Sequence, residues 1–234
     1  GDVMIQKLAD RLAQVDLLER AAKLLMQQVD FRLEGEEKAR VGARLATIRL
    51  LNKQPTMAAD AITRSDEVDI PPFLEAQRRQ LLARAYIDQG MENKALNVLD
   101  KDETRNADLL RAEIYWKAQK WRPASRMLYR LVNSTGAKPR KKLNDQQALY
   151  VMNLAVSMAL GGDERGINKI IRDFGSSMDK TSYKDAFRLI ASPDATGLID
   201  SGSVARTVSV ASNFKNFMAA YKKKIKDGKL SQMN

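Results

Sequence analysis

The sequence contains no histidine and no cysteine among its 234 residues. A thiol nucleophile, an imidazole general base and a Cys/His zinc site therefore cannot be built from this chain. Disulfides are excluded too, so cysteine usage does not distinguish a reducing compartment from an oxidising one. A phosphate-binding loop is also missing, because no Gly-Lys-Ser or Gly-Lys-Thr sequence follows Gly161-Gly162.

The remaining reactive side chains lack the surroundings that catalysis needs. Carboxylate pairs such as Asp66-Glu67 and Asp102-Glu103 lie in turn-like sequence, without apolar flanks that would raise a carboxyl pKa toward a catalytic value. No serine lies in a nucleophile-elbow sequence, and no histidine could serve it as a base. We therefore expect no enzyme activity, no catalytic residue, no metal site and no cofactor.

Long apolar runs are also missing. No uninterrupted run approaches the roughly 18 to 20 residues of a membrane span, and the N-terminus lacks the basic-then-apolar order of a signal peptide. We expect a soluble, cytoplasmic chain, with the periplasm or a membrane-attached parent protein as the alternatives. Because Gly1-Asp2 opens directly into helical sequence without an initiator Met, we expect an excised piece of a larger, bacterial protein.

The residues that are present favour a helical, folded chain. The hydrophobic fraction is 44% and the charged fraction 29%, a balance typical of globular rather than disordered proteins. Ala, Leu, Lys, Arg, Gln and Met are abundant, and these residues lose little side-chain freedom in a helix. The predicted fold class is all-α.

The chain is strongly basic, with a formal net charge of +11. Such a charge attracts an acidic protein, a nucleic acid or an anionic lipid surface over long range. The alternative is a solvated basic surface, because acidic and basic residues alternate at helical spacing in segments such as 35–40. We favour the solvated surface as the interpretation of most of this charge.

One segment shows a clear packing pattern for a pair of helices. Leu82-Ala83 and Tyr86 precede Gly90, and Ala95 follows it. Side chains as small as Ala83 and Ala95 let two antiparallel helices cross closely, while the larger neighbours fill the space around the crossing. Gly90 can adopt the left-handed conformation that ends a helix.

The same pattern recurs along the chain. Ala21, Ala58, Ala95 and Ala124 occupy the small position of the second helix, at spacings of 37, 37 and 29 residues. Upstream matches include Leu8, Ala9 and Leu12, and then Leu45 and Ala46; Arg49 stands where an aromatic residue is expected. Downstream matches are Ala112, Tyr115, Leu128 and Leu131, and more faintly Leu154, Ala155, Gly162, Ile167 and Ile171. Five helical hairpins are predicted.

Residues 3–175 resemble the tetratricopeptide-repeat superfamily, with degenerate repeats. The resemblance implies a right-handed α-solenoid of about five antiparallel hairpins, whose first helices line a concave groove. By the habit of that superfamily, the function would be a non-catalytic scaffold or adaptor that binds a segment of another protein. An irregular helical bundle is the alternative fold.

Placing the repeats in tetratricopeptide register assigns nine residues to the partner-binding groove. They are Arg40, Arg44, Gln77, Gln80, Arg84, Asp88, Glu113, Trp116 and Lys117. Exposed aromatic and arginine side chains dominate protein interfaces, which favours Trp116, Arg84 and Arg44, although packing is an equal alternative for Trp116. The expected partner is a protein or peptide segment, an acidic one included.

A basic helical-repeat RNA-binding protein is the alternative function. Such proteins recognise one base per repeat, which requires evenly spaced repeats. The repeats of this chain are unevenly spaced, so we favour protein binding and keep RNA binding as the alternative. The oligomeric state is left open.

Beyond the repeats, residues 176–234 are predicted to form a C-terminal helical cap with a basic tail. A short helix is expected near Tyr183 to Ala191, and a long amphipathic helix over residues 203–226, ending in lysines. This long helix would cover the last hairpin, with partner recognition or oligomerisation as alternatives. Within the repeats, the break at residues 133–142 bears the cluster Arg140-Lys141-Lys142, which we expect to be a solvated loop or to contact an acidic partner.

Overall fold

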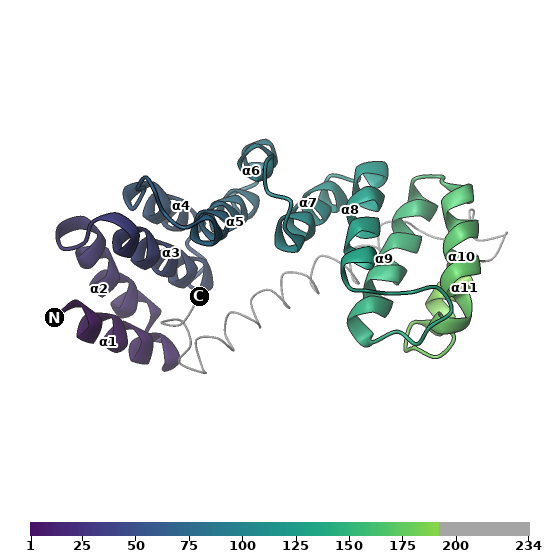
Figure 1. Ribbon diagram of the computed structural model, residues 1–234, viewed down its shortest axis with the longest axis horizontal. Helices are drawn as coiled ribbons and strands as arrows, with labels where there is room; N and C mark the ends of the chain where they lie inside the picture. Colours follow the sequence, from purple (N-terminus) through teal and green to yellow (C-terminus); the bar gives the residue numbers. More distant parts are fainter. Residues whose placement is uncertain (192–234) are drawn as a thin grey trace. The chain divides into compact units, whose positions relative to one another are not determined.

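The computed structural model describes residues 1–191, and in this range the chain forms eleven α-helices and no strand (Figure 1). The predicted all-α class is confirmed. The helices are α1 (Asp2–Gln14), α2 (Leu18–Phe31), α3 (Gly35–Leu51), α4 (Pro55–Arg64), α5 (Pro72–Asp88), α6 (Glu92–Leu99), α7 (Arg105–Lys117), α8 (Trp121–Ser134), α9 (Asp145–Leu160), α10 (Glu164–Met178) and α11 (Lys184–Ala191).

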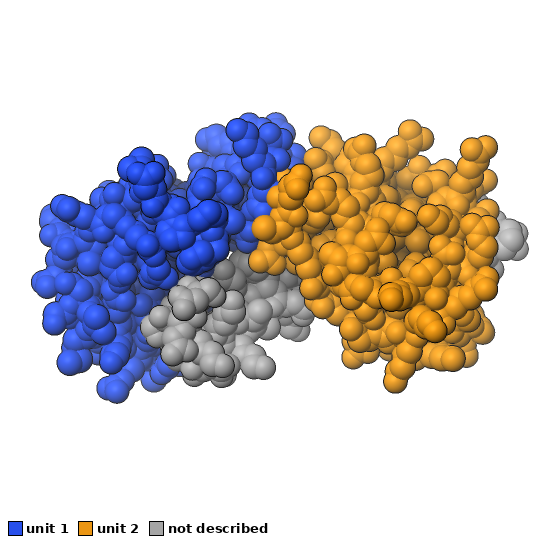
Figure 2. Space-filling model, in the orientation of Figure 1, with its two compact units in different colours: residues 1–102, 216–234 blue, residues 103–215 orange. Residues whose placement is uncertain are grey.

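The described residues divide into two compact units between Asp102 and Glu103 (Figure 2). Unit 1 covers residues 1–102 and contains α1 to α6; unit 2 covers residues 103–191 and contains α7 to α11. The division expected after residue 175 stays a prediction. The short helix expected near Tyr183 is α11, whereas the long helix expected over residues 203–226 and its basic tail lie outside the described residues.

Within each unit, each helix packs against the next one along the chain. In unit 1, α3 also packs against α5; in unit 2, α9 also packs against α11. Neighbouring contacts of this kind are compatible with a helical repeat fold.

Five helices, α1, α3, α5, α7 and α9, end in the same turn. In α5, Gly90 takes a left-handed φ of 74°, Met91 N–H donates to Tyr86 C=O at 2.8 Å, and Gly90 N–H donates to Ile87 C=O at 3.1 Å. This pair of bonds is the Schellman motif, which satisfies carbonyls that the helix end leaves unpaired. The equivalent left-handed residues are Asp16, Lys53, Gly90, Gln119 and Gly162, and the spacings between them are 37, 37, 29 and 43 residues.

The predicted small position follows each of these turns at a constant distance. Ala21, Ala58, Ala95 and Ala124 each lie five residues after the left-handed residue, and all four are fully buried. At the fifth turn the position holds Ile167, which is partly exposed. The predicted register is therefore confirmed in four of the turns, where a small side chain permits close helix contact.

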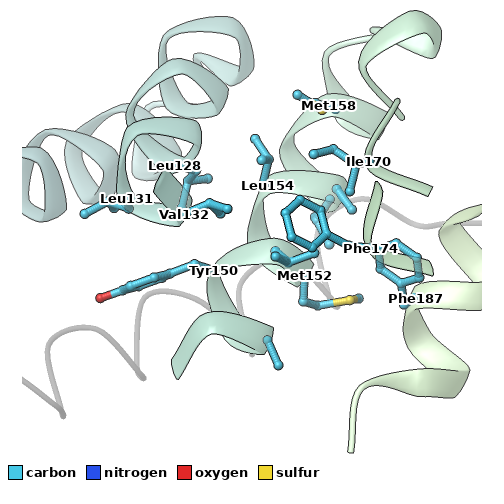
Figure 3. Close-up of a cluster of buried hydrophobic side chains, with 14 of the residues drawn as sticks. Leu128, Leu131, Val132, Tyr150, Met152, Leu154, Met158, Ile170, Phe174 and Phe187 are labelled. Atoms are coloured by element: carbon cyan, nitrogen blue, oxygen red, sulfur yellow. The ribbon is translucent and has the colours of Figure 1, made fainter. Parts of the chain in front are cut away.

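In four of these pairs the first helix, α3, α5, α7 or α9, is more enclosed than the second; α1, with three buried residues, is the exception. Every residue of α3 from Val41 to Leu50 is buried, and so is every residue of α9 from Ala148 to Met158. The second helices α2, α4, α8 and α10 bury only one side. In the core of unit 2, Met152, Phe174 and Phe187 come together from α9, α10 and α11 (Figure 3).

One expected core residue is exposed. Leu8 of α1 was assigned to the packing pattern, but it is 49% exposed, while its neighbours Ala9 and Ala13 are buried. A step of one residue rotates a helical side chain by about 100°, so the alanines face the unit and Leu8 faces outward.

Candidate interaction surfaces

Buried arginines join the helices of unit 1. Arg44 of α3 forms an ion pair with Asp10 of α1, and Arg44 Nη1 also donates to Gln6 Oε1 at 3.2 Å. Burial raises the pKa of Asp10, and the nearby Arg44 guanidinium opposes that rise. The pair therefore links α1 to α3 at the cost of removing two charges from water.

Arg49 shows how a polar contact replaces an expected aromatic residue. The side chain is buried, and Arg49 Nη1 donates to Glu19 Oε2 at 2.9 Å and to Gln54 Oε1 at 2.6 Å. The hydrogen bond from Arg49 is the main cause that lowers the pKa of Glu19. This contact could not be predicted from local sequence, because Glu19 lies 30 residues away from Arg49.

Arg78 of α5 connects three helices. Its Nη1 donates to Ala39 C=O of α3 at 2.7 Å and to Ser65 Oγ at 2.9 Å, and its Nη2 donates to Ile62 C=O of α4 at 2.8 Å. The last bond places a cation at the C-terminal end of α4, where the helix dipole favours positive charge. Burial lowers the pKa of Arg78, and Asp66 and Glu67 oppose this effect.

The six predicted groove residues of unit 1 are engaged within the chain. Arg40 pairs with Glu36 and Glu37 on its own helix, and Gln80 Nε2 donates to Asp102 Oδ2 at 2.8 Å. Arg84 is 2% exposed and lies 3.5 Å from the Asp88 carboxylate. Gln77 is partly buried.

The three predicted groove residues of unit 2 show a similar arrangement. Lys117 Nζ lies 2.9 Å from Glu113 Oε1, and the Glu113 side chain is buried. Trp116 is 4% exposed, and its ring packs edge-on against Trp121 with 5.5 Å between ring centroids.

Burial changes the interpretation of these nine residues. The structure brings together the pairs Arg84–Asp88 and Glu113–Lys117. The expectation that Arg44 and Arg84 are exposed is wrong, because each is enclosed by its own chain. Trp116 is buried as well, in agreement with the packing alternative stated for it. A role of the nine residues in binding a partner stays a prediction, and Arg40, Gln77, Asp88 and Lys117 are the ones that reach the surface.

An apolar surface that the sequence analysis did not identify lies on α1. Met4 and Leu8 of α1 and Val15, which directly follows the helix, keep helical spacing along one side, and Val3 is exposed on another side of the same helix. Their exposed fractions are 71%, 49%, 67% and 67%, respectively. Exposed apolar side chains grouped on one helix are typical of a surface that contacts a protein.

The two units differ in charge. Residues 1–102 contain 16 Lys and Arg against 17 Asp and Glu, whereas residues 103–191 contain 17 Lys and Arg against 9 Asp and Glu. Unit 1 is therefore close to neutral, with a charge of −1, and unit 2 carries +8. The net charge of +11, which sums over the whole chain, does not reveal this asymmetry.

The cations of unit 2 gather on the outer sides of α8 and α10. Arg122 and Arg126 share one side of α8 with Tyr129, and Arg165, Lys169 and Arg172 share one side of α10. All six of these side chains are exposed. Lys169 Nζ lies 3.4 Å from Tyr129 Oη and 5.4 Å from the centre of its ring, so the two sides adjoin.

Known proteins offer no guide to the role of these surfaces. The chain has no significant match among models of protein families, curated protein sequences or solved structures. Over residues 1–191, no helix is both long enough and apolar enough to cross a membrane.

Proposed function

We propose that this chain is a non-catalytic interaction scaffold, a tetratricopeptide-like solenoid that holds a segment of another protein. The observation that carries the proposal is the turn repeated at Asp16, Lys53, Gly90, Gln119 and Gly162. Each turn is followed at once by a second helix, so the helices pair as five hairpins, in the right-handed stack typical of such repeats.

The buried polar contacts support a rigid framework. Arg44, Arg49 and Arg78 each reach residues on a neighbouring helix, and these contacts fix one helix against the next. Partly satisfied polar groups in a core are costly, so such contacts favour one arrangement over alternatives. A rigid stack presents its surface side chains to a partner without first losing conformational entropy.

A protein partner fits the surface better than RNA read base by base. Spacings of 37, 37, 29 and 43 residues between the repeated turns would not keep step with one base per repeat. The positions on the first helices that reach the surface are Asp88 and Lys117, which are exposed, and Arg40 and Gln77, which are partly exposed. We assign these positions and the apolar side of α1 to the protein partner.

A pull-down from the lysate of the source organism, with and without nuclease, tests this function. A double variant, Arg40→Ala with Gln77→Ala, should lose the captured protein, while Arg64→Ala with Gln27→Ala should retain it. Arg64 and Gln27 are exposed on the second helices α4 and α2, so the control removes the same two side-chain types. Capture that disappears on nuclease treatment, or that both variants retain equally, would refute the proposal.

A further inference from the structure

We propose that unit 2 carries a second, separate binding surface, which binds the phosphate backbone of a nucleic acid. We call it the basic surface, and it consists of Arg122 and Arg126 of α8 together with Arg165, Lys169 and Arg172 of α10. It shares no residue with the protein-binding positions assigned above, so it goes beyond the scaffold function and can be tested independently.

The charge of the basic surface is not neutralised by the protein. Ion pairs in unit 2 join Arg111 and Arg130 to Asp108, Lys117 to Glu113, and Arg188 to Asp179. None of the five cations of the basic surface takes part in an ion pair with the part of the chain that the structure describes.

Unit 1 provides the contrast. Eight of its arginines have a carboxylate within 4 Å, from Arg32, which pairs with Asp2, to Arg84, which pairs with Asp88. Four of these eight, Arg44, Arg49, Arg78 and Arg84, are buried, and unit 1 also has exposed arginines without such a pair within residues 1–191, Arg11 and Arg20. What sets the basic surface apart is that its five exposed cations lie together on adjoining sides of α8 and α10.

The geometry of the surface suits a linear polyanion. Arg122 and Arg126 are one helical turn apart, about 6 Å along the axis, and Arg165 and Lys169 repeat this spacing on α10. The contact between Lys169 and Tyr129 joins the two rows. Arginine forms two parallel hydrogen bonds with a phosphate group, which a row of guanidinium groups can repeat along a strand.

A loop extends the basic surface at one end. Residues 138–142 contain four exposed cations, and Arg140 N–H donates to Asp173 C=O of α10 at 2.8 Å. Arg140 holds a left-handed φ of 59°, which is uncommon for a residue with a side chain. The loop is therefore held beside Arg172 by a defined backbone contact, and its cations add to the same positive region.

The lack of exposed apolar groups favours a nucleic acid over a membrane or an acidic protein. In the described part of unit 2, Tyr129 is the one large hydrophobic side chain that is exposed. Peripheral membrane helices insert apolar side chains, and protein interfaces centre on buried aromatic or aliphatic residues. A surface of cations with a single tyrosine matches binding to phosphates, in which electrostatic attraction supplies most of the affinity.

Fluorescence anisotropy with the full 234-residue chain tests this proposal. The probes are a labelled 20-nucleotide RNA and a labelled 20-base-pair DNA of mixed sequence. If each of the five cations of the basic surface contacts one phosphate, the log–log salt slope should be about −4.5 or steeper on the duplex and about −3.5 or steeper on the single strand. Raising the salt from about 50 to about 200 mM should then weaken duplex binding roughly 500-fold or more.

Two variants with equal charge locate the site. Arg122→Gln, Arg126→Gln, Arg165→Gln and Arg172→Gln together should lower affinity at least about a hundredfold and make the duplex slope less steep by about 3.6. The control, Lys7→Gln, Arg11→Gln, Arg20→Gln and Lys23→Gln, removes four exposed cations from α1 and α2 and should change affinity less than about threefold. Both variants keep every lysine that follows residue 215.

A third variant guards against misfolding of the first. Lys138→Gln, Lys141→Gln and Lys142→Gln change only exposed loop residues, and should weaken binding about tenfold or more. The proposal is overturned if the control weakens binding as much as the α8 and α10 variant. It is also overturned if the chain binds poly-glutamate or phosphatidylglycerol vesicles while binding neither nucleic acid.

Discussion

Gly42 of α3 lies directly against Ser65, the residue that ends α4. A Cβ atom added at Gly42 would overlap both Ser65 Oγ and Ser65 Cβ. Ser65 cannot move aside freely, because its hydroxyl donates to Ala61 C=O at 2.7 Å and accepts from Arg78 Nη1 at 2.9 Å. The glycine therefore allows α3, α4 and α5 to meet at one point.

Replacing Gly42 by alanine should destabilise unit 1 by about 1–3 kcal/mol, the usual cost of overpacking. Denaturant unfolding measures the change. Gly175→Ala is the matched control, because an added Cβ there meets only Ile171 Cγ2 at 3.8 Å, and alanine is favoured in a helix. Ser65→Gly in the Gly42→Ala background should recover part of the loss, and no recovery would show that the clash is elsewhere.

At the repeated left-handed turns, replacing glycine and introducing glycine should change the stability of the protein in opposite directions. Gly90→Ala should destabilise by about 1–2 kcal/mol, since a side chain disfavours this conformation and nothing lies within 4 Å of the added Cβ to clash. Gln119→Gly at the equivalent position should stabilise by up to about 1 kcal/mol, because glycine removes that strain. Thermal melts compare the two, and a shift of the same sign for both would contradict the shared turn.

The close helix contacts predict sensitivity to larger side chains. Ala83→Leu and Ala95→Leu should each destabilise by about 1–3 kcal/mol, because both alanines are fully buried. Ala186→Leu, at an exposed position of α11, is the control and should change stability by less than about 0.5 kcal/mol. If the buried variants unfold no earlier than the parent, the packing described for these positions is wrong.

The Arg44–Asp10 pair predicts a pH-dependent effect. Burial raises the pKa of Asp10 in the folded chain, so the folded state holds the proton more firmly than the unfolded state. The contribution of Asp10 to the free energy of unfolding is therefore fully present below the pKa that it has in the unfolded chain. This contribution is lost as the pH rises through the pKa that Asp10 has in the folded chain. Arg44→Met removes the opposing guanidinium, and should raise the pKa of Asp10 further, as measured by carbon NMR of the carboxyl group.

Stability measurements check the same pair. At neutral pH, Arg44→Met should lower the free energy of unfolding by about 3–5 kcal/mol, because it leaves the buried carboxylate of Asp10 without its partner. The cost should shrink at acid pH, and it should be largely removed by adding Asp10→Asn. A cost that does not depend on pH would mean that the charge of Asp10 is not the cause.

Periodicity predicted the helical fold because small residues and helix ends are local signals. Ala21, Ala58 and Ala95 were placed correctly by spacing alone, and Gly90 was assigned its left-handed conformation. Three equivalent turns were harder to predict, because residues with side chains hold the left-handed position there: Asp16, Lys53 and Gln119. The hydrogen bonds of the turn, rather than glycine, keep them in place.

The candidate site was less predictable, because the burial of a polar residue depends on distant partners. Arg44 and Arg84 had the spacing of groove residues, but Asp10, 34 positions before Arg44, and Asp88 pair with them in the folded chain. The basic surface was missed for a related reason. Its cations are ordinary helix-surface residues in sequence, and only the folded arrangement shows that α8 and α10 present them together, without acidic partners.

The most direct test of the scaffold function is photo-crosslinking at single positions of the full chain in its own cell extract. A photoreactive residue at Gln77 or Lys117 should form an adduct with one and the same protein, unaffected by nuclease. The same residue at Thr56 or Thr63, which are exposed on α4, should not form it. Adducts at Thr56 and Thr63 as strong as those at Gln77 and Lys117, or adducts with nucleic acid alone, would contradict the scaffold function.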